Sequence, residues 1–161
     1  MASLVSTLTS YLPQHPGLLP QWLLLVSIVS IANSVQAYTT LSFTSRVYAG
    51  PSPSASKPKP PSANLMHPSA PHSPATPLSS RTFGTWTAIQ SMVRLYAAYN
   101  ISDANMYQMA FLTYVVAWLH FMSEWLVFGT ARWGQGLAGP VFVANGTLVW
   151  MWVQWGFYVS S

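Results

Sequence analysis

The sequence contains no cysteine and very few charged residues. The absence of cysteine excludes disulfides, thiolate catalysis, and zinc or iron–sulfur sites built from cysteine ligands. Only 5% of the 161 residues are Asp, Glu, Lys or Arg, whereas soluble domains carry roughly 25%. A water-facing surface cannot be built from so few charges, so the composition argues against an ordinary soluble domain.

Apolar and aromatic residues are abundant instead. Hydrophobic residues make up 51% of the chain, and its eight Trp and eight Tyr are the side chains that collect where a bilayer meets water. Membrane lipid is therefore the expected solvent. The net charge of +4 comes from single, scattered basic residues, and the aromatic residues lie in apolar runs, so we expect no binding of nucleic acid.

Four apolar stretches have about the 20-residue length that crosses a bilayer. They cover residues 20–42, 83–101, 105–128 and 138–159. No positive segment precedes the first stretch, and it is longer than the core of a signal peptide, which favours a retained helix. We therefore predict an all-α integral membrane bundle of four transmembrane helices, with residues 1–161 as a single membrane domain.

Residues 50–80 separate the first two predicted spans and are dominated by proline, serine and alanine. This composition buries too little apolar surface to offset its chain entropy, which predicts a disordered cytosolic linker. A recognition role for its PxxP-type segment is the alternative. The basic residues outside the spans lie in the first and third loops, which places these loops in the cytosol and both termini in the lumen. They are Arg46, Lys57, Lys59, Arg81 and Arg132.

Three ionisable residues lie inside the predicted spans, where each costs energy and is a functional candidate. His120 and Glu124 are four positions apart and share one face of the third helix. Arg94 shares a face of the second helix with Gln90. Depths counted at about 1.5 Å per residue from an edge near Trp86 and Phe128 put Arg94 level with His120.

Two interpretations of these residues stay open. In the structural one, Arg94 and Glu124 form a buried ion pair that His120 joins by a hydrogen bond. In the catalytic one, His120 and Glu124 act as general acid and base beside a substrate pocket. The chain has only four histidines, so no metal site is expected. Its one GxGxxG match, "GQGLAG", lies in a turn between two predicted membrane helices and not after a strand, and the Walker and GxSxG motifs are absent, so no nucleotide or serine-hydrolase site is expected. Asn33 and Gln36 are expected to hydrogen-bond to a neighbouring helix.

Four segments resemble the ergosterol biosynthetic protein 28 family of fungi and animals. They read "LPQWLLLVSIVSIANSVQAY", "SSRTFGTWTAIQSMVRLYAAY", "YVVAWLHFMSEWLVFGTARWGQGLAGPVF" and "TLVWMW". The resemblance covers residues 19–152 apart from the proline-rich insertion, which is longer than the family pattern. The recurring motifs map onto Arg81, Thr82, Phe83, Gly84, Thr85, Trp86, Arg94, His120 and Glu124.

The resemblance implies a non-catalytic anchor in the membrane of the endoplasmic reticulum. Its implied partners are the sterol C-4 methyl oxidase, the sterol C-3 dehydrogenase/decarboxylase and the 3-keto sterol reductase, joined in fungi by the sterol 24-C-methyltransferase. It implies no cofactor and no catalytic residue. The alternative is a small membrane enzyme, or a sterol-binding protein, that uses His120 and Glu124 on a sterol intermediate. Formation of a homo-oligomer is left open.

Overall fold

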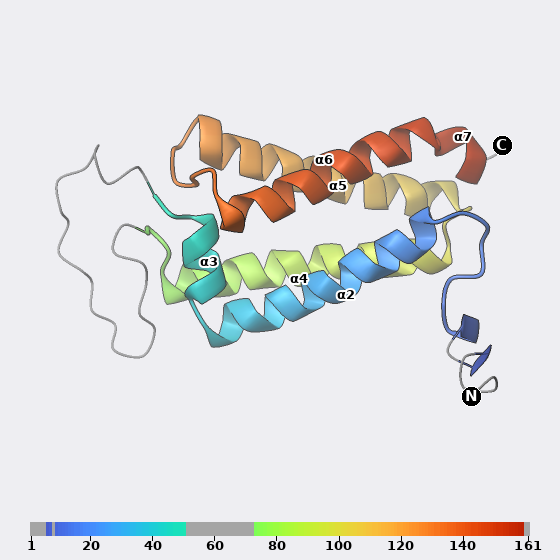
Figure 1. Cartoon of the computed structure of the whole chain (residues 1–161), viewed down its shortest axis with the longest axis horizontal. Helices are drawn as coiled ribbons and strands as arrows, with labels where there is room; N and C mark the ends of the chain where they lie inside the picture. Colours follow the sequence, from blue (N-terminus) through green and yellow to red (C-terminus); the bar gives the residue numbers. More distant parts are fainter. Residues whose placement is uncertain (1–5, 8, 51–72, 160–161) are drawn as a thin grey trace.

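The computed structural model describes residues 6, 7, 9–50 and 73–159 (Figure 1). Its helices are α2 (Leu19–Thr39), α3 (Ser42–Val47), α4 (Pro77–Tyr99), α5 (Ala104–Leu126), α6 (Gln135–Val153) and α7 (Trp155–Tyr158). The described part of the chain contains no strand, which confirms the prediction of an all-α protein there.

The helix ends differ from the predicted spans for local reasons. Helix α4 begins six residues earlier than expected, because Thr76 and Ser79 form a reciprocal capping box and Pro77 occupies the first turn. The first span was predicted to reach residue 42, but α2 ends at Thr39 and α3 follows as a separate short helix. Residues 51–72 of the predicted linker lie outside the described residues, whereas 77–80 of it are helical.

The four long helices form a bundle of two pairs (Figure 1). Helix α2 packs along α4, and α5 packs along α6, while α4 also contacts α5 across the tight turn at 100–103. The start of α2 and helix α7 lie at one end of the bundle, toward the two termini. At the opposite end, here called the loop end, are α3 and the α5–α6 connection. Exposed Arg46, Arg81 and Arg132 belong to elements at the loop end, so the described basic loops share one side, as predicted.

Two of the long helices, α2 and α6, are long and apolar enough to cross a membrane by length and composition. All four nevertheless expose large apolar side chains on their outer sides, and one example from each is Val35, Ile89, Val116 and Val149. Helices α4 and α5 do not meet the criterion of length and composition, and they carry polar side chains that include Arg94, His120 and Glu124. Several of these, such as Ser91 and Arg94, are buried inside the bundle.

Candidate functional site

The motif Arg81–Trp86 lies on α4, and its centre makes the closest contact with α2. A Cβ added at Gly84 would lie 2.9 Å from the Tyr38 ring and 3.0 Å from the Ser34 carbonyl oxygen. The Ser34 hydroxyl donates to the Gly84 carbonyl oxygen at 2.7 Å, and the hydroxyls of Tyr38 and Thr85 bond at 2.6 Å. Glycine is therefore required at position 84 because two helix backbones meet there.

The remaining motif residues divide between the interior and the surface. Phe83 and Trp86 point inward and meet edge to face with ring centroids 5.2 Å apart. The Trp86 ring also lies 5.2 Å from the His120 ring, which joins α4 to α5. Arg81 and Thr82 are exposed. The motif thus supplies one packing contact and one aromatic wall, and it does not form a single polar site.

His120 and Glu124 line a pocket of about 470 Å³ at the loop end, together with Tyr48 and Thr130. The His120 Nε2 atom and the Tyr48 hydroxyl are 2.6 Å apart. The Thr130 hydroxyl donates to the Glu124 carboxylate. The chain can return to Glu124 because Gly129 adopts a φ of 63°, a left-handed conformation that strains other residues.

Tyr48 remains a hydrogen-bond donor over a wide pH range. Burial raises the pKa of its hydroxyl, and the nearby Glu124 carboxylate raises this pKa further. A neutral Tyr48 hydroxyl can donate to His120 Nε2, which then acts as an acceptor. Each ionisable side chain of this loop-end pocket therefore has a hydrogen-bond partner within the chain.

The predicted ion pair between Arg94 and Glu124 is wrong. Among the described residues no Lys or Arg lies within ion-pair distance of an acidic side chain, and Glu124 bonds to Thr130 instead. The depth comparison failed because Trp86, the assumed edge of the bundle, lies nine residues inside α4, whose first residue is Pro77. Trp86 is level with His120 and not with Phe128, so the register of α4 against α5 differs from the assumed one by about two helical turns, or roughly 10 Å.

Arg94 is only 6% exposed, yet its partners are all neutral. Its Nε donates to the Thr113 hydroxyl at 2.9 Å, and its Nη2 donates to the Gln90 side-chain oxygen at 3.0 Å and the Thr113 carbonyl at 3.3 Å. The guanidinium carbon lies 3.9 Å from the centre of the Tyr114 ring, a cation–π contact. Nη1 forms no hydrogen bond with a described residue.

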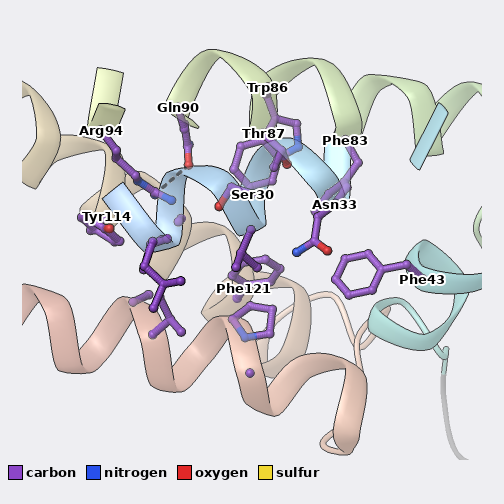
Figure 2. Close-up of a pocket in the computed structure, with 18 of the residues that line it drawn as sticks. Ser30, Asn33, Phe43, Phe83, Trp86, Thr87, Gln90, Arg94, Tyr114 and Phe121 are labelled. Carbon is purple, nitrogen blue, oxygen red and sulfur yellow. Dashed lines mark hydrogen bonds between the residues drawn. The ribbon is translucent and has the colours of Figure 1, made fainter. Parts of the chain in front are cut away.

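A cavity of about 370 Å³ lies between the α2–α4 pair and the α5–α6 pair. Figure 2 shows Arg94 and Tyr114 at one end of it and Phe43 at the other. Its polar lining comes mainly from α2 and α4, and the walls from α5 and α6 are largely apolar. The polar lining residues on α2 and α4 include Ser30, Asn33, Thr87, Gln90 and Arg94.

The prediction that Asn33 and Gln36 bond to a neighbouring helix is also wrong. Asn33 points into the central cavity (Figure 2), whereas Gln36 is exposed. Neither side chain hydrogen-bonds to a described residue. Ser34 and Ser80 make the contacts between α2 and α4 instead, since their short hydroxyls lie on the buried faces and reach backbone carbonyls of the other helix.

Sequence reasoning missed several residues that complete these two sites. Tyr48 and Thr130 belong to connections between helices, where no periodic pattern marks a partner. Tyr114 is one aromatic residue among many in an apolar run. No group of three or more His, Cys, Asp or Glu side chains suited to a metal ion occurs in the described ranges.

Comparison with known proteins gives one consistent result. The family model described as "Erg28 like protein" matches residues 19–149. "Ergosterol biosynthetic protein 28" of Candida albicans is 44% identical over 144 residues, which cover 89% of this chain and 90% of that protein. The chain belongs to the ergosterol biosynthetic protein 28 family. The family member of Saccharomyces cerevisiae is 37% identical over 158 residues, covering 98% of this chain and 93% of its own length.

A more distant relative extends the family to animals. "Ergosterol biosynthetic protein 28 homolog" of Homo sapiens is 31% identical over 138 residues, covering 85% of this chain and 84% of that protein. No solved structure matches the chain. The match to the family model runs from α2 to near the end of α6, so the residues of both the central cavity and the loop-end pocket lie within the matched range.

Proposed function

We propose that this protein is a non-catalytic scaffold in the membrane of the endoplasmic reticulum. It holds the sterol C-4 methyl oxidase, the C-3 dehydrogenase/decarboxylase and the 3-keto reductase together, with the 24-C-methyltransferase added in fungi. The names of its relatives refer to ergosterol biosynthesis, which supports a role in sterol synthesis. Tethering raises the effective concentration of each enzyme near its neighbour, so a poorly soluble intermediate passes on before it escapes.

The observation that carries the proposal is the distribution of polar and apolar groups. The outer sides of all four long helices are apolar, while the ionisable side chains Arg94, His120 and Glu124 bond to groups within the chain. An apolar outer surface suits lipid and the helices of other membrane proteins. The bundle therefore has outer surface available for partners, and its ionisable side chains are held inside it by hydrogen bonds within the chain.

The outward-facing apolar residues also support four membrane spans. Helices α4 and α5 expose Ile89, Met92, Leu112 and Val116 among others, and such side chains are stable outside the bundle when lipid covers them. The end with the basic residues is then cytosolic and both termini are lumenal. A glycosylation tag at the C-terminus should be modified in microsomes. An unmodified C-terminal tag, with a modified tag in the 51–72 segment, would reverse this orientation.

Recovery of the enzymes with the full chain tests the scaffold. The tagged protein should recover all three C-4 demethylation enzymes from detergent extracts. Two triple alanine variants locate the contact: Leu112, Val116 and Leu119 on α5, or Ile28, Ile31 and Val35 on α2. Each set is an exposed stripe, so loss of one enzyme from one variant, with retention in the other, identifies an interface. Recovery of none of the enzymes by the wild-type chain would overturn the proposal.

An assay of turnover separates the scaffold from the enzymatic alternative. The purified chain should convert none of the sterol intermediates of C-4 demethylation. Conversion that disappears in Glu124→Gln would overturn the non-catalytic assignment, because this change keeps the size of the side chain and removes the carboxylate.

A further inference from the structure

The central cavity combines one buried cation with a largely apolar wall. Arg94 lies at one end, and apolar residues of α5 and α6 such as Ala117, Phe121, Val143 and Ala144 line the opposite wall. A volume of about 370 Å³ falls within the range of roughly 300–1,000 Å³ typical of ligand sites. The cavity therefore has the size and the lining of a site for one amphipathic molecule.

The charge of Arg94 lacks a counter-ion within the described chain. A buried cation is costly unless it is paired, and neutral hydrogen bonds with one cation–π contact offset only part of that cost. Both N–H groups of Nη1 remain without a partner among the described residues. A guanidinium matches the geometry of a carboxylate, with which it forms paired charge-assisted hydrogen bonds.

Further polar groups along the same wall are also unused. The side chains of Ser30 and Asn33 form no hydrogen bond with a described residue, and the buried Thr87 hydroxyl has no partner. Figure 2 shows these three residues lying along the cavity from α2 and α4. An unpaired buried hydroxyl such as that of Thr87 is uncommon in folded proteins. Together with the half-buried side chains of Ser30 and Asn33, it indicates a molecule with polar oxygens.

The position of the opening indicates where that molecule comes from. The exposed residues of the lining belong to α2 and α6, where Leu25 and Val29 face Gln135 and Gly139 across the opening. In the four-span arrangement this opening lies on the side of the bundle, toward lipid. A ligand that enters there partitions into the bilayer.

We propose that the central cavity binds a lipid carboxylic acid, with its carboxylate on Arg94 and its apolar body between α2, α5 and α6. If the scaffold proposal holds, the reactions of the partner enzymes indicate which acid binds. An enzyme that oxidises a C-4 methyl group and one that removes that carbon as CO2 must be connected by a sterol carboxylic acid. The choice of a sterol as the apolar part of the ligand rests on the proposed function, whereas the proposal of a site for a lipid carboxylic acid does not.

Binding to the full chain in phosphatidylcholine nanodiscs tests the site. The probes are a radiolabelled steroid carboxylic acid, the steroid alcohol with the same rings, and a saturated fatty acid. The steroid acid should bind about 10- to 100-fold more tightly than the alcohol, the preference expected for a charge-assisted pair. Equal binding of acid and alcohol would overturn the role of Arg94. If the fatty acid binds as tightly as the steroid acid, the choice of a sterol is overturned and the proposal of a lipid carboxylic acid stands.

Two pairs of variants connect binding to the cavity. Arg94→Met should abolish the preference for the acid, and Arg94→Lys should keep part of it. A Cβ added at Gly139 meets nothing within 4 Å, so Gly139→Leu fills the opening without disturbing a neighbour, and binding of both steroids should fall at least about tenfold. Gly146→Leu is the matched control, because Gly146 is exposed on the same helix and does not line the cavity. Equal effects of the two leucine variants would overturn the site.

Enzyme recovery by the same variants distinguishes failure of this proposal from failure of the scaffold. Gly139→Leu should still recover the three enzymes, since it changes the cavity and leaves the outer stripes intact. A wild-type chain that binds the acid but recovers no enzyme would leave the site standing and the scaffold overturned. A third outcome is that the wild-type chain binds acid and alcohol equally and that Arg94→Met fails to recover one enzyme. This outcome would assign Arg94 to a carboxylate on a partner helix and overturn the lipid site.

Discussion

Helix α2 has one closely packed side and one open side. Against α4 it forms three hydrogen bonds, in which the Ser34 and Tyr38 hydroxyls take part and the Ala37 carbonyl accepts from the Ser80 hydroxyl. Gly84 lets the two backbones approach. Toward α6 it borders the central cavity, and a hydrogen bond from Trp22 to Thr147 at 2.8 Å bridges the two helices near the end of the bundle that carries the termini. The packed side holds the bundle together, and the open side leaves room for a ligand.

The largest expected difference in stability between the two sides of α2 comes from substitutions at a pair of glycines. Gly84→Val should lower the free energy of unfolding by about 1–3 kcal/mol, because the new side chain meets the Ser34 backbone and the Tyr38 ring. Gly139→Val, which enters open space, should change it by less than about 0.5 kcal/mol. Thermal unfolding in detergent, followed by circular dichroism, measures both. Equal losses would mean that the side toward α6 is as tightly packed as the side toward α4.

A pair of serines on α2 gives the next largest effect. Ser34→Ala removes a buried hydrogen bond to the Gly84 carbonyl oxygen and should cost about 0.5–1.5 kcal/mol. Ser30→Ala, inside the cavity, removes no hydrogen bond to a described residue and should be nearly neutral for stability. The same unfolding assay compares them. A loss at Ser30 equal to that at Ser34 would contradict the assignment of Ser30 to an unused polar wall.

The smallest expected effect concerns the bridge between α2 and α6. A double-mutant cycle with Trp22→Phe and Thr147→Val should give a coupling energy of about 0.6 kcal/mol, the usual size for a hydrogen bond between membrane helices. A coupling of zero would show that the bridge does not restrain the opening. A coupling several times larger would make α2 and α6 a rigid unit, which would hinder lateral entry of a ligand.

Much of the fold follows from the order of residues along the chain. Apolar runs predicted the four long helices to within a few residues at most ends. Errors arose where a local signal was overlooked: the capping box at Thr76 begins α4 early, and the short helix α3 lacks the length that marks a span. The family resemblance rested on motifs and was confirmed by the comparisons.

The candidate site was predicted only in part, since its residues were found but not their partners. His120 and Glu124 do share one pocket, as their i and i+4 spacing predicts. Their partners Tyr48 and Thr130 come from connections between helices, which no spacing rule reaches. Arg94 was paired with the wrong residue because Trp86, assumed to mark the edge of the bundle, lies nine residues inside α4.

The composition of the chain alone argued against an ordinary soluble domain and placed polar residues inside apolar helices. Helical periodicity decides which residues share a face, because it is a property of one helix. Register and rotation between helices depend on the turn at 100–103 and on the close contact at Gly84, and these decided that Arg94 meets Thr113 and Tyr114 rather than Glu124. The cavity likewise exists only because α2 packs on α4 and leaves space toward α6.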